Sequence, residues 1–240
     1  MTLALAHARA MTIELLRHPA YVVPTLAFPT VFFVFFAGSE TDADMRMATF
    51  AGFAAIGVAF FQFGVGIAVE RASPWERYLR TLPVSAGIRL LSRTLSAAVF
   101  AVSAAGVLIA VAVLATPVGL PAARWGELAA LLVAGSAPFA LLGIALGYWA
   151  PARGALPIAN LLYLGLSYAG GLWFSPQHLP HAVRSISPLL PTRAFANTLA
   201  AAATGSAVPW SSCAALFGFS VLFAALALAG YRRDEGIHFS

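Results

Sequence analysis

Residues 48–69 read ATFAGFAAIGVAFFQFGVGIAV, a run of 22 residues without a charged side chain, and Glu70-Arg71 follows it directly. An α-helix rises about 1.5 Å per residue, so about 20 apolar residues cross the roughly 30 Å hydrocarbon core of a membrane. A strand of a membrane barrel would alternate polar and apolar residues over about ten positions, and this run does not alternate. The stretch therefore predicts a membrane-spanning helix.

The rest of the 240-residue chain repeats this pattern. It is 60% hydrophobic and only 10% charged, and its mean hydropathy is +0.85. Soluble domains are roughly 45–50% apolar and about 25% charged, and disordered chains are more polar still. Uncharged windows, trimmed at turn signals, predict six spanning helices, at about 20–38, 48–69, 94–116, 128–150, 155–174 and 210–231. We therefore predict an all-α integral membrane protein in which residues 1–240 form a single transmembrane domain.

All fourteen basic residues are arginine, and their distribution predicts the topology. With the N-terminus inside, ten fall on the cytoplasmic side: Arg9, Arg17, Arg71, Arg77, Arg80, Arg89, Arg93, Arg153, Arg232 and Arg233. Four fall outside: Arg46, Arg124, Arg184 and Arg193. The positive-inside rule then places both termini in the cytoplasm, and it explains the pI near 10 better than a nucleic-acid partner does. A cleaved signal peptide is the alternative for the first span, although residues 20–36 exceed its usual length of about 7–15 apolar residues.

Two segments outside the spans also have a recognisable character. Residues 1–19 mix apolar and charged side chains, which predicts an amphipathic helix lying at the membrane interface. Four prolines between residues 176 and 191 exclude a continuous helix there. We expect residues 175–208 to form a cap of short helices that re-enters the outer membrane face, with a longer helix at 192–204.

The stretch 70–93 is the richest polar segment between two spans. After Pro74, two helical turns would place Trp75, Leu79 and Leu82 on one face, with charged residues on the remainder. This apolar face could rest on the bilayer interface, where tryptophan and arginine are common, or it could dock a partner protein. The pattern alone leaves both interpretations open.

The sequence offers no catalytic or metal-binding constellation. Without lysine, the chain cannot form a Walker A phosphate loop or a Schiff base. His178 and His181 have no carboxylate or cysteine beside them to complete a metal site, and the lone Cys213 lies in an apolar run. The hydrolase-like string at 165–169 lacks its final glycine. We therefore expect neither an enzyme nor a cofactor on this chain, and a membrane-embedded enzyme is the least supported class.

Four polar side chains inside the predicted spans are candidates for a substrate path. Gln62 lies in the second span, and Asn160, Tyr163 and Ser167 share one face of the fifth at i, i+3, i+7 spacing. Such residues line a path for a partly polar substrate, or they simply hydrogen-bond neighbouring helices. Gly143 and Gly147 in the fourth span form a GxxxG pair, which predicts close helix packing.

Together these features resemble the membrane subunit of an ABC-2 type transporter, of the multidrug or daunorubicin-resistance-like exporters. Glu70-Arg71, followed by Leu79 and residues 82–85 (LPVS), is similar to the family's E-R-E-x-G-T-x-E-x-L-L-x-T-P-V-S loop. Residues 179–191 (LPHAVRSISPLLP) resemble its L-P-x-x-x-x-x-I-S-x-x-x-P segment after the fifth span. Ala72 and Pro74 replace the second glutamate and the glycine of the first pattern.

The resemblance implies a mode of action. The loop 70–93 would dock a separate ABC ATPase subunit, which binds ATP and Mg, through Glu70, Arg71, Trp75, Glu76, Arg77 and Leu79. Spans two and five would line the substrate path at the interface with a second permease subunit, in a homodimer or a heterodimer. We thus predict a bacterial plasma-membrane exporter, embedded in membrane lipid, for a hydrophobic or amphipathic substrate such as a drug-like molecule, a lipid or a lipid-linked glycan. The alternative is a non-transporting membrane anchor or assembly partner for a soluble protein.

Overall fold

The computed structural model describes residues 2–36, 42–74 and 86–238, and the regular structure in these ranges is entirely helical. The prediction of an all-α protein is therefore confirmed for the described part of the chain. The α-helices are α1 (Thr2–Leu16), α2 (Pro19–Phe36), α3 (Ala43–Val58), α4 (Gly66–Arg71), α6 (Ala86–Ala115), α7 (Ala122–Trp149), α8 (Ala152–Ala169), α9 (His181–Ile186), α10 (Pro191–Thr204) and α11 (Trp210–His238). Shorter elements are the π-helix η1 (Ala59–Val65) and the 3₁₀ turns η2 (Pro176–His178) and η3 (Ser187–Leu189).

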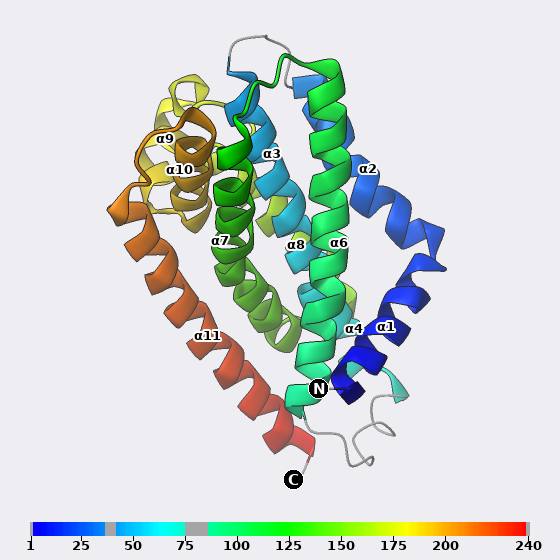
Figure 1. Cartoon of the computed structure of the whole chain (residues 1–240). Coiled ribbons are helices and arrows are strands. Elements are labelled where there is room, and N and C mark those ends of the chain that lie inside the picture. Colours follow the sequence, from blue (N-terminus) through cyan, green and yellow to red (C-terminus); the bar gives the residue numbers. More distant parts are fainter. Residues whose placement is uncertain (1, 37–41, 75–85, 239–240) are drawn as a thin grey trace.

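The long helices run alongside one another between two ends of a bundle (Figure 1). Both chain termini lie at one end, which we call the terminal end, and α9 and α10 lie toward the opposite end. The helix α11 runs diagonally between the two ends. The predicted segment at 192–204 corresponds to α10.

Five helical stretches in the described residues are long and apolar enough to cross a membrane. They are Pro19–Phe36, Ala43–Arg71, Gly87–Ala115, Ala122–Trp149 and Trp210–Asp234. The remaining predicted span, 155–174, corresponds to α8, which is 18 residues long and is not among the five. Its average hydropathy is lower because it contains Arg153, Asn160 and two tyrosines.

The second stretch, in which α3, η1 and α4 follow one another without a break, is the central helix of the bundle. Its most apolar window is 78% buried, compared with 17–33% for the other four stretches. Small residues allow this close packing: a methyl group at Gly147 of α7 would lie 2.7 Å from the Ile67 side chain and 2.7 Å from the Phe63 carbonyl oxygen. Gly143 meets the central helix in the same way, so the close packing predicted from the GxxxG pair is confirmed.

The N-terminal helix α1 packs on α6 through small residues. Ala4 and Ala8 are buried, and the Ser92 hydroxyl of α6 donates a hydrogen bond to the Ala4 carbonyl at 3.1 Å. This contact leaves Leu5 and Leu16 more than half exposed. Leu5 and Leu16 thus face away from the bundle, whereas Leu15 packs against its core.

The proline-rich segment caps α8 at the opposite end of the bundle. The hydroxyls of Ser187 and Thr192 donate to the carbonyls of Ala169 and Leu166, at 2.6 and 2.7 Å, in the last turn of α8. The Ala169 carbonyl is among the last four of the helix, which lack an intrahelical donor, and Ser187 satisfies it. The Leu166 carbonyl already accepts the Gly170 N–H at 2.8 Å, so Thr192 is its second donor. The following helix α10 packs against α3 and α7, and its Phe195 is fully buried.

Candidate functional site

The charged pair Glu70-Arg71 lies at the end of the central helix, at the terminal end of the bundle. The described chain continues only to Pro74 before it resumes at Ala86. Although adjacent in sequence, the two side chains bind different helices. We call the group formed by Glu70, Arg71, Arg93, Asp234 and the last turn of α7 the junction.

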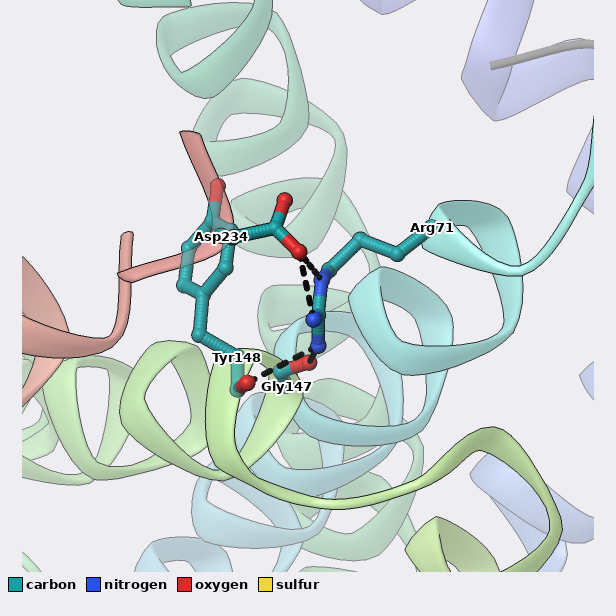
Figure 2. A network of polar contacts seen from close by, with 4 residues as sticks. All are labelled: Arg71, Gly147, Tyr148 and Asp234. Atoms are coloured by element: carbon teal, nitrogen blue, oxygen red, sulfur yellow. Dashed lines mark hydrogen bonds and ion pairs between the residues drawn. The ribbon is translucent and has the colours of Figure 1, made fainter. Parts of the chain in front are cut away.

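Arg71 connects the central helix to both α7 and α11 (Figure 2). Its Nε and Nη2 donate to Oδ1 of Asp234 in α11, at 2.9 and 2.5 Å. Its Nη1 donates to the carbonyl oxygens of Gly147 and Tyr148 in α7, at 2.8 and 2.9 Å. The guanidinium carbon also lies 5.4 Å from the centre of the Tyr148 ring.

The position of Arg71 suits both of its partners. The last carbonyls of a helix have no intrahelical donor and carry the negative end of its dipole, so a cation stabilises them. The Asp234 side chain is only 4% exposed and that of Arg71 is 22% exposed, so water screens the ion pair weakly. Three helices are therefore joined by one guanidinium.

Glu70 connects the end of the central helix to α6. Its carboxylate forms an ion pair with Nη2 of Arg93, and Nη1 of Arg93 donates to the backbone carbonyl of Gln62 at 2.8 Å. Gly66 makes room for this contact, because a methyl group there would lie 2.7 Å from Nη1 of Arg93. The accepting carbonyl lies in η1, and π-helical turns inside α-helices are frequent at functional sites.

The Gln62 side chain is buried in the bundle without a hydrogen bond of normal geometry. It is 4% exposed, and neither its oxygen nor its nitrogen meets hydrogen-bond geometry with any described residue. The hydroxyl of Tyr21 in α2 lies beside it and is also buried without a bond of normal geometry. Buried polar groups usually form hydrogen bonds of good geometry, so this pair of polar side chains is an unusual feature inside a membrane protein.

The predicted polar face of α8 is directed at a different part of the central helix. Tyr163 is fully buried, its hydroxyl donates to the Phe53 carbonyl at 3.2 Å, and its ring stacks on that of Phe53 with centroids 4.5 Å apart. Ser167 is buried with no described partner for its hydroxyl, and Asn160 is half-buried. The structure therefore brings Tyr163 onto α3, whereas the Gln62 side chain lies beside Tyr21 of α2.

The residues predicted for ATPase contact fall into two groups. Glu70 and Arg71 are in the junction, whereas Trp75, Glu76, Arg77 and Leu79 lie outside the described residues. The sequence patterns did not predict the two junction partners: Arg93 contributed only to the predicted topology, and Asp234 was not a candidate site residue. The signal for Asp234 was present: it is an acidic residue that follows two arginines at the end of a span. No cluster of three or more His, Cys, Asp or Glu side chains is found among the described residues.

A family model described as ABC-2 type transporter matches residues 3–204. The chain belongs to the ABC-2 type transporter family. This ABC-2 protein is 23% identical over 232 residues to "Putative transport permease YvfS" of Bacillus subtilis (strain 168), covering 93% of this chain and 95% of that protein. No solved structure gives a significant match.

Family membership and the apolar helices together identify a multi-pass membrane protein. The matched region includes the central helix, the junction residues Glu70 and Arg71, and the proline-rich segment. Asp234 lies beyond residue 204, so the family match does not account for it. The ion pair with Arg71 is thus a feature of this ABC-2 protein that only the structure reveals.

Proposed function

We propose that this protein is the permease subunit of an ATP-driven ABC-2 exporter and that it works with a separate ATPase. The single observation that carries the proposal is the junction in a member of this transporter family. There, the two residues that begin the polar loop 70–93 bind α6, α7 and α11 through side chains. A force applied to that loop would therefore act on three further helices.

The proposed topology has six spans with both termini in the cytoplasm. The helix α8 serves as the additional span, because 18 residues cover about 27 Å and nearly cross the hydrocarbon core. The terminal end of the bundle is then the cytoplasmic side, where ten of the fourteen arginines fall. In this arrangement the proline-rich segment, with α9 and α10, lies at the outer face.

The ATPase would bind the loop 70–93. Since this chain has no lysine, it has no Walker A loop of its own, and ATP and Mg would be held by the partner. Movement of the loop during ATP binding and release would pull on Glu70 and Arg71. Coupling then requires that the partner contact the loop differently in its two nucleotide states.

The substrate would pass along the central helix. Gln62 and Tyr21 offer polar groups that have no described hydrogen bond, and Asn160, Tyr163 and Ser167 offer more on α8. The aromatic rings of α2 and α3 around these positions suit a hydrophobic or amphipathic molecule, such as a drug, a lipid or a lipid-linked glycan. A second permease subunit, identical or homologous, would complete the path in the plasma membrane of a bacterium.

Co-purification with the ATPase tests the docking surface. Trp75→Asp with Leu79→Asp should abolish co-purification of the ATPase and ATP-dependent export in vesicles, while membrane insertion stays normal. The matched control carries the same two changes at the opposite end, Trp210→Asp with Leu189→Asp, where both side chains are at least 75% exposed. The control should retain the ATPase.

Two results would contradict the proposal. Unchanged co-purification in the Trp75 and Leu79 variant would show that the ATPase does not dock on the loop 70–93. An ATPase that binds this loop while no panel of amphiphiles is exported would instead favour a membrane anchor or assembly partner.

A further inference from the structure

A cavity of about 220 Å³ opens at the terminal end, next to the junction. Its walls are residues 148–151, at the end of α7 and the turn into α8, together with Arg71, Arg233 and Asp234. The cavity is smaller than the roughly 300–1,000 Å³ of sites that enclose a drug-sized ligand. Since α7 and α11 are membrane-spanning candidates that end here, it lies where a lipid headgroup would be.

The cavity has an excess positive charge. Arg71 uses its Nε, Nη1 and Nη2 groups on Asp234 and on the α7 carbonyls, so that pair is neutral overall. Arg233 forms no ion pair with a described carboxylate, and its guanidinium carbon lies 5.2 Å from the centre of the Trp149 ring. A guanidinium held over an indole keeps N–H donors at its edge, and these fit a phosphate.

Trp149 is held in place by α11. Its Nε1 donates to the Leu226 carbonyl at 3.0 Å, and the ring is close to Gly230, where a methyl group would lie 2.8 Å from Nε1. The Trp149 residue is still 49% exposed. A half-exposed tryptophan at the end of a span is typical of the headgroup level of a membrane.

An apolar surface continues from the cavity along α11. Leu222 and Leu226 are one helical turn apart and are 50% and 41% exposed. A ligand that places a phosphate at Arg233 could therefore lay acyl chains beside these leucines. A soluble phosphate compound has no acyl chains and would leave both leucines exposed.

We propose that this cavity binds the phosphate of an anionic phospholipid. Arg233 is the phosphate ligand, Trp149 holds its guanidinium in place, and the acyl chains follow the exposed face of α11. The exposed Arg153 and Arg232 add to the positive field that attracts an anionic headgroup. This inference requires only that α7 and α11 span the membrane, and it does not depend on transport.

Lipid titration followed by native mass spectrometry of the purified full chain tests this site. Phosphatidylglycerol is the probe, phosphatidylcholine supplies the same phosphodiester without net charge, and glycerol phosphate supplies the anion without acyl chains. Arg233→Gln should weaken phosphatidylglycerol binding about tenfold or more, as expected for a charge-assisted contact. The matched control Arg232→Gln removes the same charge one residue away and should weaken binding about fivefold or less.

Trp149→Leu should also weaken phosphatidylglycerol binding while Arg233 keeps its charge. Equal melting temperatures of the lipid-free variants show that folding is intact. Equal losses in the Arg232 and Arg233 variants would overturn the site in favour of a diffuse basic surface. If glycerol phosphate binds as tightly as phosphatidylglycerol, the site binds a soluble anion and the lipid assignment is wrong. Loss of ATPase co-purification in Arg233→Gln with unchanged lipid affinity would mark the cavity as a protein contact instead.

Discussion

The ion pair between Arg71 and Asp234 allows a quantitative prediction because Asp234 is the more deeply buried partner, while Arg71 also binds two backbone carbonyls. Arg71→Gln takes the guanidinium away from a carboxylate that is 4% exposed and from two α7 carbonyls at 2.8 and 2.9 Å. Removing one partner of a buried pair costs about 3–5 kcal/mol. Asp234→Asn keeps a hydrogen-bond acceptor, and Arg71 keeps both carbonyls, so this change should cost only about 1–2 kcal/mol.

The assay is unfolding of the purified protein in mixed micelles, read as the free energy of unfolding and as the melting temperature. For a chain of this size, about 1 kcal/mol corresponds to roughly 2–4 °C. Arg71→Gln should therefore lower the melting temperature by roughly 6–20 °C, and Asp234→Asn by roughly 2–8 °C. Arg232→Gln, an exposed arginine in the same helix as Asp234, is the control and should change it little.

The double variant completes the test. Because the two residues are in contact, the cost of changing both should be smaller than the sum of the single costs, by about 1–3 kcal/mol. Additive costs would refute the ion pair. A larger loss of stability in Asp234→Asn than in Arg71→Gln would also refute it, since only Arg71 binds the two helix carbonyls.

Three further predictions concern the central helix. Gly147→Ala would place a methyl group 2.7 Å from atoms of that helix and should lower the free energy of unfolding by about 1–3 kcal/mol in the same assay. Its control is Gly165→Ala, where nothing lies within 4 Å of the added methyl group, and this change should raise the free energy of unfolding by about 0.5–1 kcal/mol. Tyr163→Phe should cost about 0.5–1.5 kcal/mol because one hydrogen bond is lost while ring stacking persists, and no loss would contradict that bond. Gln62→Leu removes a buried amide that has no hydrogen bond of normal geometry, so stability should stay equal or rise while export in vesicles falls. Unchanged export would exclude Gln62 from the path.

The membrane-spanning segments could be predicted because the length of an apolar run and the charges at its ends are local properties of the sequence. A run without charges, such as 48–69, has few alternatives to a helix in lipid, since its backbone must satisfy its own hydrogen bonds. The proline-rich segment and the helix after it were also readable, because proline excludes helix continuation wherever it occurs. The resemblance to the ABC-2 family rested on short motifs that include Glu70 and Arg71.

The lateral order of the helices was not predictable in the same way. Lipid is as apolar as a leucine side chain, so hydropathy does not tell which helix is surrounded by others. The central position of Ala43–Arg71 follows from small residues on several helices that meet, such as Gly147 beside Ile67. That match involves residues 80 positions apart in sequence, and only the folded chain brings them together.

The sequence by itself determined an all-helical membrane chain and the place where a polar loop leaves the second span, and its arginines predict a topology. The tertiary structure decided what that place is attached to. Arg71 could have met lipid headgroups or solvent, but the end of α7 and Asp234 of α11 lie beside it and accept its four hydrogen bonds. Hydropathy acts on each segment separately, whereas an ion pair between residues 71 and 234 exists only when packing puts two distant helix ends within 3 Å of each other.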